Sequence, residues 1–323
     1  MTEQIQRSFV ASCAAVLLAA IGVAAQQQIV DPDFKVIVDN PAYPNGGPTV
    51  AIDEAHSNFH TAGGQYKPFA DLLTHDGYHV TSSTRKFDPG VFAGVDVLVV
   101  ANANARSFTA SAFSEAECDV VRDWVQTGGS LLLISDHAPF GTSAANLAER
   151  FAVRMGKGWV FEPTTDSITT QLTFSRENGL LGSHAVLNGR NAGEVVKTVK
   201  SFTGQSLSGP QGAIVLLKLT DAAREAPTTE DLDAEAAARS QSAPVGIAGT
   251  HSVSAAGRSQ GLALTFGKGR VVVIGEAAMF SAQVVTLPQG DRQVTFKAGM
   301  NAPGNDDRQF ALNVVHWLSG LLP

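Results

Sequence analysis

Residues 49–64 have the sequence TVAIDEAHSNFHTAGG, in which a short β-branched run ends in acids, imidazoles and a Gly-Gly turn. The run predicts a buried strand, and apolar residues at helical spacing between Tyr66 and Asp76 predict a helix behind it. Two later stretches repeat this order, LLLISDH at 131–137 and VVVIGE at 271–276. In open parallel sheets, ligand sites lie at the carboxyl ends of the strands. The pattern therefore predicts an α/β protein with a site at one sheet edge.

The other periodic segments extend this prediction. A nearly continuous apolar run at 95–101 predicts another strand, and a helix is expected to begin at Ser111 or Ser114 and to end at Gly128-Gly129. Unbroken apolar strands that alternate with helices are shielded from solvent only in a sheet that is covered on both faces. We therefore expect a three-layer, flavodoxin-like α/β fold with a mainly parallel sheet, in which 49–53, 95–101, 130–135 and 270–275 are adjacent.

The later part of the chain has a different pattern. Short apolar or alternating runs between 155 and 220 predict a β-rich extension of the same sheet. Residues 221–242 are rich in Ala and acids and predict an exposed loop or short helix. Residues 286–305 are interpreted as a long loop, and 306–318 as a closing amphipathic helix.

The N-terminus indicates export. Arg7 precedes an apolar run from Phe9 to Val23, and Val23-Ala24-Ala25 offers the small residues that signal peptidase recognises. The run is shorter than the about 20 residues of a bilayer span, so a cleaved signal peptide at 1–25 is favoured over a membrane anchor. We expect a polar arm at 26–47, one α/β domain at 48–323, a periplasmic or extracellular location, and no membrane span after cleavage.

Composition and charge exclude several classes of protein. With 44% hydrophobic and 16% charged residues, the chain can bury a full core. A net charge of −7 gives no basic face for nucleic acid. Of the two cysteines, only Cys118 follows the predicted cleavage site, so the mature chain has no internal disulfide. Cys118 lies in a helical pattern and is interpreted as a small buried hydrophobe.

Most of the candidate site residues directly follow a predicted strand, and several of them are carboxylates that would meet at one edge of the sheet. Carboxylates that converge in one crevice repel each other unless a proton or cation is shared, which favours a divalent metal, Ca²⁺ or Zn²⁺. The alternative is that these groups pair among themselves and cap helices. The assigned roles are catalytic for His137, Glu54 and Asp136; substrate-binding for His60, Asn58, Asn301 and Asn305; and metal-binding for Asp53, His56 and Glu276.

Several motifs together resemble a known family. They are DEAH at 53–56 with Gly63-Gly64 and Tyr66, GGSL at 128–131, GKGRVVV before Gly275-Glu276, and Asn305-Asp306 leading the last helix. This set resembles the DUF4350-type bacterial proteins of the class I glutamine amidotransferase-like superfamily, which includes gliding-protein and intraflagellar-transport domains thought to bind sugars. The resemblance spans about residues 48 to 320 and implies their α/β fold.

The chain departs from that superfamily at the nucleophile. Amidotransferases carry a cysteine on a sharp turn after a central strand, whereas Asp136-His137 stand at the corresponding place here. Glutaminase activity is therefore not expected.

Two functions from different classes follow from these residues. One is a secreted, metal-dependent hydrolase of a small ester, lactone or amide, with His137 or Glu54 as general base. Ser135 is an alternative nucleophile, although no G-x-S-x-G elbow surrounds it. The other function is a non-catalytic domain that binds a carbohydrate or another small ligand, or takes part in assembly.

Overall fold

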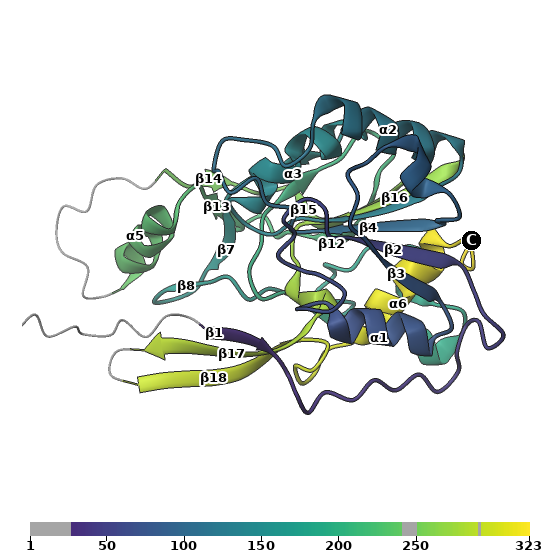
Figure 1. Cartoon of the computed structure of the whole chain (residues 1–323). Helices are drawn as coiled ribbons and strands as arrows, with labels where there is room; N and C mark the ends of the chain where they lie inside the picture. Colours follow the sequence, from purple (N-terminus) through teal and green to yellow (C-terminus); the bar gives the residue numbers. More distant parts are fainter. Residues whose placement is uncertain (1–26, 241–250, 290–291) are drawn as a thin grey trace, which may run out of the picture.

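A computed structural model describes residues 27–240, 251–289 and 292–323 (Figure 1). The predicted signal peptide at 1–25 and its cleavage point lie outside these residues. Within the described part of the chain, no helix is long and apolar enough to cross a membrane.

A nine-stranded mixed sheet forms the centre of the molecule. Its order is β3-β2-β4-β5-β16-β15-β11-β6, and β12 pairs with β15. The strands are β2 Thr49–Asp53, β3 His79–Ser83, β4 Val97–Ala101, β5 Ser130–Ile134, β6 Arg154–Met155, β11 Leu207–Ser208, β12 Ile214–Lys218, β15 Ser259–Phe266 and β16 Gly269–Ile274. Neighbours from β3 to β16 are parallel, and the pairings from β16 onward are antiparallel. The predicted adjacency of four parallel strands is confirmed.

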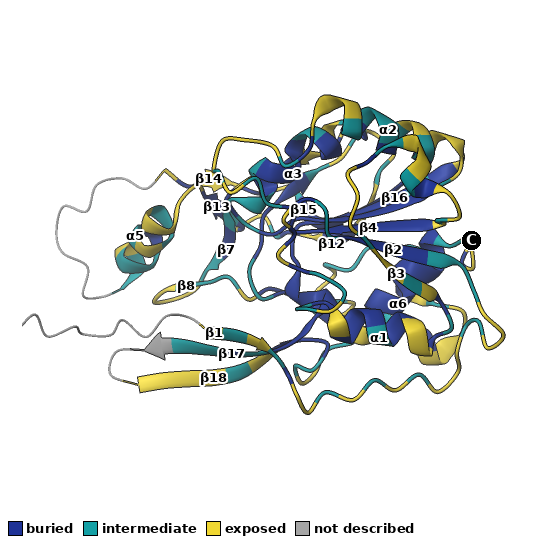
Figure 2. Ribbon diagram, in the orientation of Figure 1, coloured by how far each residue is buried: buried dark blue, intermediate teal, exposed yellow. Residues whose placement is uncertain are grey.

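Helices cover both faces of this sheet (Figure 1). They are α1 Lys67–His75, α2 Glu115–Thr127, α3 Phe140–Glu149, α4 Ala185–Asn188 and α6 Asp307–Leu318. Because side chains alternate along a strand, Val50 and Ile52 of β2 pack in the core with Phe69 and Phe310, while Ala51 packs in the core with Cys118 on the opposite face. Figure 2 shows the central strands buried between these layers.

Two helix ends lie where the capping residues in the sequence predict them. The Ser114 side chain accepts from the Glu117 backbone N–H and the Glu117 side chain accepts from the Ser114 backbone, which is a complete capping box. After α1, Gly77 adopts a φ of +95°, a conformation that favours glycine and ends the helix.

The β-rich region is only in part an extension of the main sheet. β6, β11 and β12 join it, as expected, but β7 Trp159–Pro163, β8 Ile168–Thr169, β13 Arg224–Ala226 and β14 Val253–Ser254 form a separate sheet. β9 Thr173–Ser175 and β10 Thr198–Lys200 form a further pair. The helix α5, Thr229–Arg239, lies beside the separate sheet and falls within the predicted acidic segment (Figure 1).

The prediction of a long loop at 286–305 is wrong. Most of it belongs to a hairpin of β17 Ala282–Gln289 and β18 Arg292–Gly299, in which Val284, Phe296 and their neighbours pair over the whole strand length. The Gly, Pro and Asn content that suggested a loop is concentrated at the hairpin turn and after β18. The N-terminal arm pairs on the free edge of β17 through β1, Gln27–Val30.

Candidate functional site

The first strand end forms a closed network around His56. Nδ1 of this ring is 2.8 Å from Asp53 Oδ2, and Nε2 is 3.0 Å from Glu117 Oε1. Asn58 completes the network, since its Nδ2 donates to Asp53 Oδ2 and its Oδ1 accepts from the His56 backbone N–H. Phe87 and Phe113 pack on the imidazole. Both ring nitrogens of His56 therefore already face carboxylates, and the amide of Asn58 is used in the loop.

Glu54, predicted to be catalytic, points toward the edge strand β3. Its Oε1 accepts from the Ser82 hydroxyl and from the Ala62 backbone N–H, both at 2.9 Å. It is not among the residues that line the large cleft described next. These two hydrogen bonds hold the turn after β2 against β3.

A cleft of about 880 Å³ lies at the carboxyl ends of β4 and β5. This volume falls in the range of small-molecule sites, about 300 to 1,000 Å³. Its wall includes Asn102, Asp136 and His137 after those strands and His60 from the turn after β2. The other wall comes from elements outside the main sheet: Gln27, Gln28 and Ile29 of β1, Gln283 and Leu287 of β17, and Thr229 and Leu232 at α5.

His137 is held in one tautomer. Its Nδ1 is 2.8 Å from the Ala138 carbonyl oxygen, which can only accept, so Nδ1 carries the proton. The ring stacks on Trp159 with centroids 5.1 Å apart and planes 19° apart. Burial lowers the pKa of His137, against the opposing effect of the Ala138 carbonyl. At neutral pH the ring is therefore uncharged, and Nε2 is the nitrogen with a lone pair.

Asp136 and Glu276 form a buried carboxyl pair on the neighbouring strand ends of β5 and β16. Burial raises the pKa of Asp136, and backbone N–H groups of His137 and Ala277 oppose this only in part. Burial also raises the pKa of Glu276, and the nearby Asp136 raises it further, against hydrogen bonds from the backbone of Met279, Ala278 and Phe202. The pair therefore retains a proton at pH values where ordinary carboxyls are ionised. Of the two, Asp136 lines the cleft.

His60 has unused hydrogen-bonding groups. It is 3% exposed, and neither ring nitrogen has a partner among the described residues. Burial lowers its pKa to about 3, so the ring is neutral and offers one N–H and one lone pair. Its ring lies between Phe59 and Tyr66, with centroids at 5.2 and 4.4 Å. Buried polar groups normally have partners, so this histidine indicates a ligand or ordered water in the cleft.

The two late asparagines hold the chain together behind the hairpin. Asn301 Nδ2 donates to Asp31 Oδ2 and to the Gln283 carbonyl, and Asn305 Nδ2 donates to the Gly299 carbonyl. Neither residue lines the cleft.

The three predicted metal ligands do not form one group, because Asp53 and His56 are in contact but Glu276 lies apart from them. Asp53 belongs to β2 and Glu276 follows β16, and these strands are separated by β4 and β5, a distance of about 14 Å at ordinary strand spacing. Throughout the described ranges, no group of three or more His, Cys, Asp or Glu is placed to hold a metal ion. The predicted crevice shared by all strand-end residues is therefore wrong for Asp53, Glu54 and His56, and Glu276 lies beside Asp136 without lining the cleft itself.

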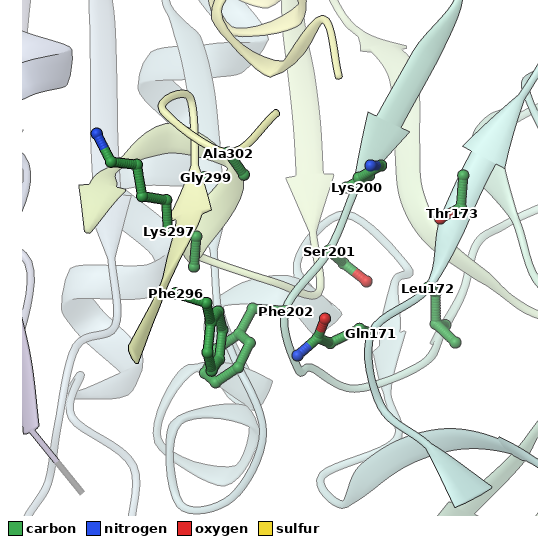
Figure 3. Close-up of a pocket in the computed structure, with 11 residues that line it drawn as sticks. Gln171, Leu172, Thr173, Lys200, Ser201, Phe202, Phe296, Lys297, Gly299 and Ala302 are labelled. Carbon is green, nitrogen blue, oxygen red and sulfur yellow. The ribbon is translucent and has the colours of Figure 1, made fainter. Parts of the chain in front are cut away.

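A second, much smaller cavity lies beside β10 and the base of β18 (Figure 3). Its volume is about 60 Å³, which suits a few waters rather than a substrate. The rings of Phe202 and Phe296, with centroids 5.5 Å apart, form one side. Because Phe202 and Gln171 also line the large cleft, this cavity lies directly behind its wall.

Some cleft residues had no clear signal in the sequence. Asn102 follows β4 as Asp136 follows β5, and its Oδ1 accepts from the Asp136 backbone N–H, so the strand-end rule identifies it in retrospect. Its φ of +46° is the left-handed conformation that asparagine tolerates. Trp159 and the residues of β1 come from separate elements, and their positions depend on tertiary packing alone.

Comparisons with known proteins support the fold. No protein-family model and no curated protein matches this chain. The N-terminal domain of mmIFT52 is similar in structure, with a TM-score of 0.54 and 13% identity over 84% of this chain and 97% of that one. A cytoplasmic protein from Salmonella typhimurium has a TM-score of 0.43 and 12% identity over 84% of this chain and 98% of its own. The similarity to the mmIFT52 domain supports a shared α/β fold, and at 13% identity it carries no function.

Proposed function

We propose that the large cleft is the active site of a hydrolase that acts on a small ester, lactone or amide. The observation that carries the proposal is the placement of His137. A neutral imidazole, oriented by the Ala138 carbonyl and by Trp159, lines the cleft directly after the buried acid Asp136. An oriented neutral base beside a protonated acid is the arrangement that general acid–base hydrolysis requires.

The reaction follows from these two groups. Nε2 of His137 takes a proton from water while the water oxygen forms a bond to the substrate carbonyl carbon. The bond to the leaving oxygen or nitrogen then breaks, and that atom takes the proton held by the Asp136–Glu276 pair. Return of the proton from His137 to the pair restores the enzyme, so that one water is consumed per bond cleaved. His60 also lines the cleft, and both of its ring nitrogens are buried without a partner among the described residues.

A non-catalytic carbohydrate-binding site is the second candidate. It is favoured by four aromatic residues on the cleft wall, Phe59, Phe140, Trp159 and Phe202, since aromatic faces pack against sugar rings. This candidate needs no proton transfer, so it predicts binding without turnover.

One assay separates the two candidates. Purified protein is incubated with chromogenic esters, lactones, amides and glycosides, with and without a chelator. Turnover of an ester, lactone or amide supports the hydrolase. Absence of turnover, together with calorimetric binding of a sugar, would overturn it in favour of the second candidate. Loss of turnover in chelator would show the metal dependence that the sequence suggested.

We also propose a more detailed fold type, a family relationship and a cellular location. We assign the 3-2-4-5-16 strand order to a three-layer, flavodoxin-like fold, and the motifs quoted above to a DUF4350-type relationship. Export to the periplasm or outside the cell is proposed from residues 1–25. N-terminal sequencing of protein from an envelope fraction should begin near Gln26, and intact Met1 in the cytosol would contradict export.

A further inference from the structure

A surface depression, distinct from the small cavity in Figure 3 and called the second depression below, opens beside the cleft. Its volume is about 440 Å³, and it shares Ile29 and Phe59 with the cleft as lining residues. These two side chains are 46% and 50% exposed and belong to the lining of both hollows, so the boundary between the hollows is apolar. A molecule bound at His137 can therefore extend over this boundary into the second depression.

The second depression has little capacity to recognise a polar group. Of its polar side chains, Lys67 is paired with Asp71 at 2.6 Å, and Gln65 Nε2 donates to the Gln28 carbonyl at 3.2 Å. Only Oε1 of Gln65 is buried without a partner among the described residues. The rest of the lining is aliphatic, aromatic or glycine. A sugar ring would leave most of its hydroxyls unpaired here, whereas a hydrocarbon chain would not.

We propose that the two hollows together bind an amphipathic acyl substrate. Its carbonyl lies among His60, Asp136 and His137, and its acyl chain passes over Ile29 and Phe59 into the second depression. This inference rests on the proposed hydrolase function and names its substrate class, an ester of a medium-length fatty acid. Each methylene buried on apolar surface should raise kcat/KM by about fourfold, the equivalent of about 0.8 kcal/mol.

Gly63 gives a steric test of this path. It lines the second depression only, its φ is not positive, and a Cβ added there meets no atom within 4 Å. Gly63→Leu should therefore fill the depression without disturbing the backbone. Phe108→Ser is the matched control, because Phe108 is 69% exposed and lines neither hollow.

The first measurement is the ratio of kcat/KM for p-nitrophenyl hexanoate to that for p-nitrophenyl acetate. Hexanoate has four more methylenes than acetate, so the ratio in the unaltered protein should be about 16-fold if two of them are buried and about 250-fold if all four are. Gly63→Leu should reduce it severalfold, and Phe108→Ser should leave it unchanged. Equal kcat/KM for the two esters in the unaltered protein would overturn the acyl site and leave the hydrolase standing.

The second measurement is calorimetric binding of the product acids, hexanoate and acetate, which needs no turnover. Tighter binding of hexanoate that Gly63→Leu abolishes supports the acyl site even if no ester, lactone or amide is hydrolysed, in which case the proposed hydrolase function fails alone. Equal affinity for both acids, with no ester, lactone or amide hydrolysed, would overturn both proposals.

Discussion

The His56 network and the His137 cleft contain the same residue types in the same position after parallel strands, yet they differ in what their side chains contact. Around His56, each ring nitrogen faces a carboxylate, and Asn58 and two phenylalanine rings close the remaining sides. Around His137, one ring nitrogen is anchored to a carbonyl, and neither ring nitrogen of the nearby His60 has a partner among the described residues. Both ring nitrogens of His56 are therefore already used, whereas those of His60 are not.

This difference indicates that the elements packed around a strand end decide whether its side chains form a closed network or line a cleft. The edge strand β3 and helix α2 cover the end of β2, and the capping residue Glu117 of α2 supplies the second carboxylate for His56. The ends of β5 and β16 lie in the middle of the sheet, with β1, β17 and α5 standing away from them across the cleft. Substitutions of residues that line the His137 cleft should therefore lower activity, and substitutions in the His56 network should lower the stability of the fold.

The largest expected effect is on catalysis. His137→Gln removes the base, so kcat should fall by about 10²- to 10⁴-fold, the usual contribution of a positioned base. The melting temperature should change by a few degrees at most. The control is His79→Gln on β3, an exposed histidine that should leave kcat unchanged. A His137 variant with full activity would remove the cleft from consideration as a catalytic site of this kind.

The next effect is on stability. His56→Ala leaves the buried Asp53 carboxyl group without the imidazole that lies 2.8 Å away, and leaving a buried hydrogen-bonding group without its partner costs about 1 to 3 kcal/mol. Urea unfolding should show a loss of this size, with kcat per folded molecule retained. If kcat falls while the free energy of unfolding stays the same, the network belongs to the site and the comparison is wrong.

A smaller effect should appear in the pH dependence of the free energy of unfolding. Burial opposes ionisation of Glu117, but hydrogen bonds from Ser114 and His56 outweigh it and lower its pKa to about 2, from 4.5 unfolded. A lowered carboxyl pKa stabilises the fold above pH 4.5, and this contribution disappears as the pH falls toward 2. Glu117→Gln should therefore cost about 1 to 3 kcal/mol at pH 6 and nearly nothing at pH 2. A pH-independent difference in urea unfolding would contradict the assignment.

The smallest expected effect is a displacement of the pH–rate profile. Burial lowers the pKa of His137, so the acidic limb of kcat/KM should lie below pH 6.5. Loss of the proton from Asp136 and Glu276, whose pKa values are raised, should give the alkaline limb. Glu276→Gln relieves the repulsion and should move only the alkaline limb, toward lower pH. Movement of the acidic limb instead would assign it to the carboxyl pair.

The sequence was sufficient for the parallel strands but only for part of the site. Apolar runs such as 95–101 predict buried strands because they are too short for a buried helix and fit a strand covered on both faces, and Ser114 with Glu117 predicts the start of α2. The strand-end rule correctly places Asp136 and His137 on a cleft. It says nothing of strand order, so it could not show that β4 and β5 separate Asp53 from Glu276. The hairpin of β17 and β18 was missed because its glycine and proline content resembles a loop.

The pairing of β1 with β17 has a practical consequence for work on this protein. Gln27 and Gln28 are the first residues that the structure describes, and both line the cleft. A tag joined directly to Gln27 would therefore start at the wall of the cleft, whereas the C-terminus lies on the side of the molecule away from β1 (Figure 1). Expression vectors should therefore carry the tag after Pro323, and assays of N-terminally tagged protein should be repeated after the tag is removed.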